Sequence, residues 1–219
     1  MADKRHARRA FLSRFGTGAT AAGLTVLAEG PAAAQSARPS EWRPSRHPED
    51  DWLDRIPGGH RFVFDTTTPA AFDNALRFAS NYFTANRNGY GLKNEDLAVV
   101  IIARHHSTAF AYADGMWNKY GTSLASRDGF TDPATKQPPT LNVYRERTEE
   151  LLRQGVHLAV CQMATRNLAG IVAKSAGTDT DAIYKELVAN LLNNAHMVPA
   201  GIVALNRAQE RGYSFAHGG

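Results

Sequence analysis

Leu97-Ala98-Val99-Val100-Ile101-Ile102 is an unbroken apolar run. A run of this length is too short for a buried helix and is typical of a strand covered on both faces, as in a parallel sheet. A second run, Val156-His157-Leu158-Ala159-Val160-Cys161, is similar and ends on the single cysteine of the chain. We therefore expect two inner strands of a largely parallel sheet.

Shorter strands and amphipathic helices alternate around these two runs. Helical spacing of three and four begins after Thr68-Pro69, a threonine cap followed by a first-turn proline. Further strands are expected at 61–65, 196–198 and 213–215, the last of them at an edge; further helices are expected near 109–116, 142–152, 162–172, 183–191 and 199–211, with a long loop over 121–141. This alternation predicts an α/β fold with a largely parallel sheet of about five strands flanked by helices.

Residues 1–36 have the pattern of a cleavable export signal. Arg8-Arg9 followed by Phe11-Leu12 resembles the twin-arginine signature, and a short run rich in Gly, Ala and Thr follows. That run is well short of the roughly 20 apolar residues that span a bilayer. We expect cleavage near Ala34 or Ser36 after recognition by the twin-arginine export machinery. The mature protein is then periplasmic, with no stable membrane anchor.

The positive charge of the chain lies mostly in this signal. Three of its four net positive charges belong to residues 1–36, so the mature protein is close to +1. This argues against a nucleic-acid partner. Residues 37–58 contain four prolines among charged residues and are expected to form an exposed leader segment, with Trp42 and Trp52 suggesting that parts of it dock on the domain. The folded domain is then expected over 59–219.

Reactive side chains follow two of the predicted strands. His105 and His106 come after the first apolar run, and Cys161 ends the second at the start of a helix. Ligands of parallel sheets bind at the carboxyl ends of the strands, and a helix N-terminus favours a thiolate. We take Cys161 as a candidate nucleophile or carrier, with His105 or His106 to move a proton. A buried, inert cysteine is the plainer alternative.

Several segments resemble one known family. The stretch Gly155–Ala164, the ending Val198-Pro199-Ala200-Gly201 with Gly212-Tyr213, and Trp117–Gly121 together are similar to the DsrE/DsrF-like sulfur-relay family, in an exported branch. The resemblance covers about residues 59–216. The chain differs in having Arg104-His105-His106-Ser107 where relatives often have a His-Gly-Pro turn.

This resemblance implies a flavodoxin-like layered α/β domain that forms homo-oligomers. It also implies that Cys161 carries sulfane sulfur as a persulfide, received from a donor protein or passed to an acceptor protein. A sulfurtransferase-like carrier is the enzyme class that would follow. Fold is a safer inference from such a likeness than activity.

An alternative is an oligomeric domain without catalysis that binds a small ligand or a soft metal. Cys161 and Met163, with His105, His106 or His196, have the donor types that suit copper. Their spacing repeats no known metal motif, so no metal ligand is assigned. No phosphate-cradling or dinucleotide-binding glycine motif occurs either, and no cofactor is expected.

Overall fold

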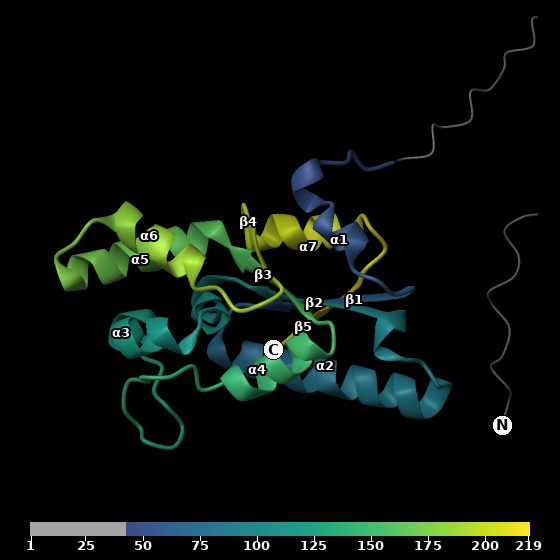
Figure 1. Ribbon diagram of the computed structural model, residues 1–219, viewed down its shortest axis with the longest axis horizontal. Coiled ribbons are helices and arrows are strands. Elements are labelled where there is room, and N and C mark those ends of the chain that lie inside the picture. Colours follow the sequence, from purple (N-terminus) through teal and green to yellow (C-terminus); the bar gives the residue numbers. More distant parts are fainter. Residues whose placement is uncertain (1–42) are drawn as a thin grey trace, which may run out of the picture. The chain divides into compact units, whose positions relative to one another are not determined.

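Five parallel strands form one sheet in the order β4-β3-β2-β1-β5 (Figure 1). The computed structural model describes residues 43–219. The strands are β1 (His60–Thr66), β2 (Leu97–Ala103), β3 (His157–Cys161), β4 (Ala195–Val198) and β5 (Ser214–His217). The predicted α/β architecture, a five-stranded parallel sheet between helices, is confirmed. Flavodoxin itself has the order 2-1-3-4-5, so the likeness to that fold lies in the layers and not in the connections.

Strand β2 lies at the centre of the sheet, and each of its seven residues is buried. Its side chains alternate between two apolar cores. Val99 and Ile101 belong to the core on one face of the sheet, whereas Val100 and Ile102 belong to the core on the other. The continuous apolar run of the sequence therefore reflects a strand with no polar face.

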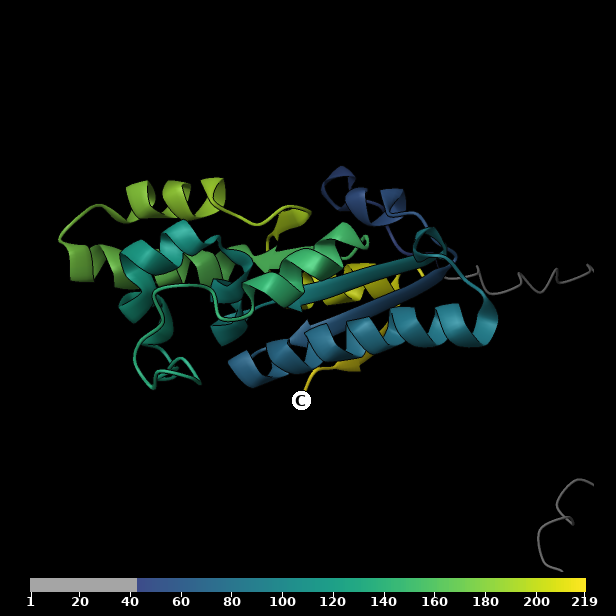
Figure 2. The ribbon, with the colours of Figure 1, turned by 60° about the horizontal axis from the view of Figure 1, so that its bottom comes forward.

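The helices are divided unequally between the two faces. The first face is covered by α2 (Pro69–Tyr90), α3 (Asp114–Ala125), α4 (Arg145–Arg153), α5 (Gln162–Ala176) and α6 (Thr180–Ala189). The second face is covered by α1 (Trp52–Arg55) and α7 (Gly201–Gln209). Figure 1 shows α1 and α7 above the strands and α2 and α4 below them, and Figure 2 shows α2 running along the strands.

The direction of the chain explains this division. From β1 to β4 each connection moves one strand in the same direction, so right-handed crossovers place all their helices on one face. The connection from β4 returns across the whole sheet to β5, and its helix α7 therefore lies on the opposite face. The outgoing loops of the neighbouring strands β3 and β4 thus separate to opposite faces.

Part of the segment before β1 packs on the sheet instead of lying exposed. Its second half forms the 3-10 helix η1 (Pro48–Asp50) and α1, and Trp52, Leu53 and Ile56 are buried in the second core. The docking that Trp52 suggested is thus observed, and the expectation of an exposed segment is wrong for the residues around it. The residues from 44 onward belong to one compact unit. Residues 1–42, with the predicted signal, lie outside the described part.

Charged side chains hold this segment to α7 and its end. The Nε of Arg211 donates to Oδ2 of Asp54 at 3.0 Å, and the Tyr213 hydroxyl donates to the carbonyl of Leu53 at 2.8 Å. Tyr213 is therefore buried, and only Phe215 of the predicted edge strand is exposed. The Tyr213 ring can be buried because its hydroxyl finds a partner inside.

The helix starts were predicted unevenly. Thr68 caps α2 as expected, and its hydroxyl accepts from the Ala71 N–H at 3.1 Å.

The helix predicted near 109–116 is divided into the 3-10 helix η3 (His105–Ala111) and α3, so the loop begins only after Ala125. Asn142 is buried and its amide donates to the Phe110 and Tyr112 carbonyls, while α4 begins at Arg145. A short 3-10 turn, η2 (Asn94–Asp96), leads into β2.

Candidate functional site

The divergence of the β3 and β4 loops places a cavity at the carboxyl edge of the sheet. In open α/β sheets, the crevice between neighbouring loops that leave to opposite faces is where ligands bind. Here the β3 loop leads directly into α5 and the β4 loop into α7. A cavity of about 310 Å³ lies between them. Its lining includes Cys161, His105, Arg104 and Arg127, with Met163 and Ile202.

Cys161 occupies the junction of β3 and α5. As the last residue of β3 it pairs with Val198 of β4, and it is also the N-cap residue of α5. From this position a side chain faces the free N–H groups of the first helical turn, and no side chain caps them here. The residue is 7 % exposed and lines the cavity. The predicted strand-end position of the cysteine is thus observed.

Arg104 follows β2 and is fixed by a buried carboxylate. Its Nε and Nη2 donate to the two oxygens of Asp65, each at 2.7 Å, while the Asp65 side chain is only 2 % exposed. The hydrogen bond with Asp65 raises the pKa of Arg104, and the nearby Cys161 adds to this when it is charged. A bidentate pair of this kind fixes the guanidinium plane. Arg104 therefore keeps its charge beside the cysteine.

The turn after β2 is held from beneath by buried hydroxyls. Ser107 accepts from the Arg104 N–H at 3.0 Å, and its own hydroxyl lies 2.9 Å from that of Thr66. Both residues are fully buried. The chain then turns through His105, which has a left-handed backbone with φ 54°. This conformation is uncommon for a residue other than glycine, and it presents His105 at the cavity.

The electrostatic surroundings of His105 are positive. Partial burial lowers the pKa of His105, and the charges of Arg104 and Arg127 lower it further against the opposing effect of Asp65. The neutral imidazole is therefore favoured at neutral pH, and a neutral imidazole can accept a proton. Cys161 and His105 were both predicted from sequence, and the structure brings them to one cavity.

Other predicted candidates lie apart from it. Nδ1 of His106 is 3.4 Å from Asp128, and His106 is not part of the lining. Arg166, one turn into α5, donates to Asp181 at 3.1 Å and does not line the cavity. His196 lies on the second face, with Nε2 2.9 Å from Nδ1 of His157. Among residues 43–219 no group of three or more His, Cys, Asp and Glu could hold a metal ion.

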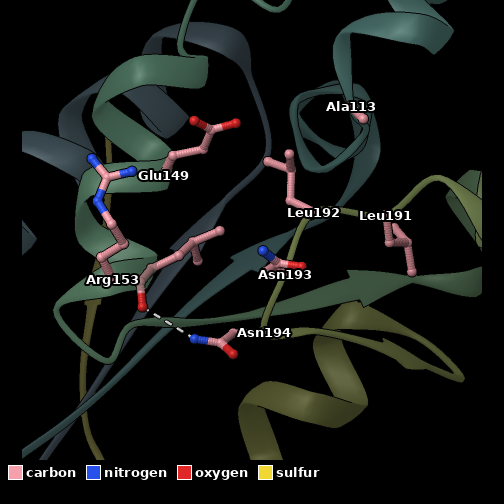
Figure 3. Close-up of a pocket in the computed structure, with 8 residues that line it drawn as sticks. Ala113, Glu149, Arg153, Leu191, Leu192, Asn193 and Asn194 are labelled. Atoms are coloured by element: carbon pink, nitrogen blue, oxygen red, sulfur yellow. Dashed lines mark hydrogen bonds between the residues drawn. The ribbon is translucent and has the colours of Figure 1, made fainter.

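A second cavity, of about 710 Å³, lies at the opposite edge of the sheet (Figure 3). Glu149 and Arg153 project from α4 on one side, and Asn194 lies on the other, with its amide donating to the Leu152 carbonyl at 3.1 Å. Asn194 directly precedes β4, so this is the amino edge. Its lining contains neither cysteine nor histidine. The smaller cavity is therefore the better candidate for chemistry.

Sequence reasoning missed Asp65, Arg127 and Gly201 and gave Arg104 no role. Asp65 and Arg104 stand at the carboxyl ends of neighbouring strands, so their meeting could have been inferred from the parallel sheet. Arg127 comes from the loop after α3, for which the sequence gives no such signal. The role of Gly201 depends on a close approach: a Cβ there would lie 2.7 Å from both Cβ and Cδ of Arg104.

No helix within residues 43–219 combines the length and apolar character needed to cross a membrane.

No family model and no curated protein matches the chain. Among solved structures, the chain is similar to MTH1491 from Methanobacterium thermoautotrophicum, described as a protein of unknown function, at 19% identity and a TM-score of 0.39. That match covers 72% of this chain and 98% of the other.

Proposed function

We propose that this protein carries sulfane sulfur as a persulfide on Cys161. The observation that supports this best is the shared cavity: the single cysteine lies with His105 and two arginines between the diverging β3 and β4 loops. A sulfur carrier needs a thiolate and surroundings that stabilise an anionic persulfide. Two guanidinium groups and an uncapped helix N-terminus supply positive charge for both anions.

Each transfer step needs no oxidant or reductant. The Cys161 thiol first gives its proton to neutral His105. The thiolate then attacks the outer sulfur of a donor persulfide, a new S–S bond forms on Cys161, and the donor leaves as a thiolate with the electron pair of the broken bond. The reverse attack by an acceptor thiolate unloads Cys161. The acceptor is a thiol-bearing protein in this proposal.

Loading is tested by cyanolysis, which converts sulfane sulfur to thiocyanate. The full chain is incubated with glutathione persulfide, freed of small molecules and treated with cyanide. We expect close to one thiocyanate for each wild-type chain and none from Cys161→Ser. Equal thiocyanate from the two proteins would overturn the proposal, as would failure of native Cys161 to load while the unfolded chain loads.

We also propose that the protein acts as a homo-oligomer. Met163 and Ile202 at the cavity rim and Phe215 on β5 are 70 %, 57 % and 44 % exposed. Met163 and Ile202 line the same cavity, and neighbouring exposed apolar side chains are typical of protein–protein contacts. Light scattering should give a mass above that of one chain at micromolar concentration, and Ile202→Asp should lower it. A monomeric wild-type protein would contradict this.

A further inference from the structure

The cavity beside Cys161 is lined by positive charge with no carboxylate. Arg104 and Arg127 both belong to the lining, and neither aspartate nor glutamate does. Asp65, which pairs with Arg104, is buried and outside the lining. The two guanidinium groups therefore attract a negatively charged ligand that enters the cavity. Stabilising the Cys161 thiolate alone would not require both of them.

Both guanidinium groups keep donors for a ligand. Arg104 uses Nε and Nη2 on Asp65, and its Nη1 makes no hydrogen bond within residues 43–219. In the same part of the chain Arg127 has neither an ion pair nor a hydrogen bond. A fixed guanidinium beside a freer one is an arrangement that suits an oxyanion, because planar N–H pairs match its oxygens.

The N-terminus of α7 lies beside the same cavity. Gly201 is its first residue and packs directly on the Arg104 side chain, where a Cβ would not fit. The N-cap residue Ala200 offers no side-chain cap, so the first N–H groups of α7 remain available beside Arg104. These donors add to the two guanidinium groups, on which the inference rests.

We propose that this cavity binds a small sulfur oxyanion, of which thiosulfate is the simplest, as the sulfur donor to Cys161. The inference rests on the proposed persulfide function and names its substrate class. The sulfonate oxygens contact Arg104 and Arg127, and the sulfane sulfur faces Cys161. A cavity of about 310 Å³ holds a small anion of this size with room for water.

The transfer balances without a further reactant. The Cys161 thiolate attacks the outer sulfur of thiosulfate and a new S–S bond forms. The S–S bond of thiosulfate breaks, and sulfite leaves with its electron pair. The arginines stabilise sulfite as it separates, which makes them useful in the transition state as well as in binding.

Binding is measured apart from reaction in the full-length Cys161→Ser protein by titration calorimetry with sodium thiosulfate at low ionic strength. We expect binding, and a loss of about tenfold or more in affinity when Arg127→Gln is added, since a charged hydrogen bond is lost. Arg87→Gln is the matched control, because Arg87 is exposed on α2 away from the cavity. It should leave the affinity unchanged.

Reaction is followed in the wild-type protein by the release of sulfite from thiosulfate, which should occur once per chain. Absence of binding, or equal effects of Arg127→Gln and Arg87→Gln, would overturn the oxyanion site even if Cys161 loads from glutathione persulfide. Binding without sulfite release, in a protein that does load from glutathione persulfide, would overturn the donor assignment alone. If neither donor loads Cys161, the proposed function fails while the anion site stands.

Discussion

At the residue scale, the candidate chemistry depends on which neighbours Cys161 has. His105 and His106 are adjacent in sequence, but only His105 lines the cavity, while His106 lies beside Asp128. Their ring centres are 6.5 Å apart and 70° inclined. The sequence indicated both histidines as candidates, but it could not show which of them lies beside Cys161.

His105→Gln should slow persulfide loading by about tenfold or more at pH 7, because the group that accepts the thiol proton is lost. His106→Gln should retain nearly the wild-type rate, since His106 faces Asp128. The rates are compared from the time course of cyanolysable sulfur, over a range of pH. If the two variants behave alike, His105 has no special role.

At the scale of elements, the site depends on the start of α7, and the second face of the sheet depends on the docking of α1. Gly201 lets α7 approach Arg104, and the α1 segment closes the second face with Trp52. The Trp52 ring stacks on His196 with ring centres 4.1 Å apart. Neither contact is visible in the sequence, since each joins residues that are distant along the chain.

Gly201→Ala should lower the free energy of unfolding by about 1–3 kcal/mol, because the added methyl group meets Arg104 and Ile102. It should also weaken thiosulfate binding by displacing Arg104. Gly170→Ala, within α5, has nothing within 4 Å of the new Cβ and should raise stability by about 0.5–1 kcal/mol. Urea denaturation measures both, and equal effects of the two changes would refute the close approach.

Stability should fall as the pH decreases from about 6.5 toward about 4. Burial, followed by the charges of His157 and Arg55, lowers the pKa of His196 to about 4 from its usual 6.5, and burial also lowers that of His157. Between these pH values the two histidines bind protons in the unfolded chain but not in the folded one, so acid favours unfolding. Above pH 6.5 both histidines are neutral in the folded and the unfolded chain, so their full contribution to the free energy of unfolding is present.

The test is the melting temperature between pH 7.5 and 4.5. His196→Phe keeps a ring against Trp52 but cannot titrate, so its melting temperature should depend less on pH. His47→Gln, at an exposed position, should follow the wild-type curve. A His196→Phe protein with the wild-type pH dependence would show that this stack does not carry the effect.

At the scale of the whole molecule, the sequence predicted the sheet better than its surroundings. All five strands were expected close to where they lie. The two inner strands β2 and β3 were the clearest, because strands buried on both faces leave continuous apolar runs. The strand order could not be derived, since it depends on long-range packing. For the docking of residues 48–56 the sequence offered only Trp52 as a sign. Cys161 was found by its position at a strand end, whereas Asp65 and Arg127 contribute through contacts that only folding creates.

Export also concerns the whole molecule, and it depends on residues outside the described part of the chain. We propose that the mature protein works in the periplasm. Arg8→Lys together with Arg9→Lys should leave uncleaved precursor in the cytoplasm, because lysine does not replace arginine in receptor recognition of the pair. Cell fractionation and immunoblotting give the answer, and normal maturation of the double variant would reject a twin-arginine signal.

The central claim is that Cys161 holds sulfane sulfur in the working protein. The most direct measurement is the intact mass of protein purified without reductant from its own compartment. We predict a species heavier than the unmodified chain by one sulfur atom, mapped to Cys161 by peptide fragmentation, lost on reduction and absent from Cys161→Ser. A native protein with only an unmodified thiol at Cys161, even after exposure to glutathione persulfide and thiosulfate, would contradict the account.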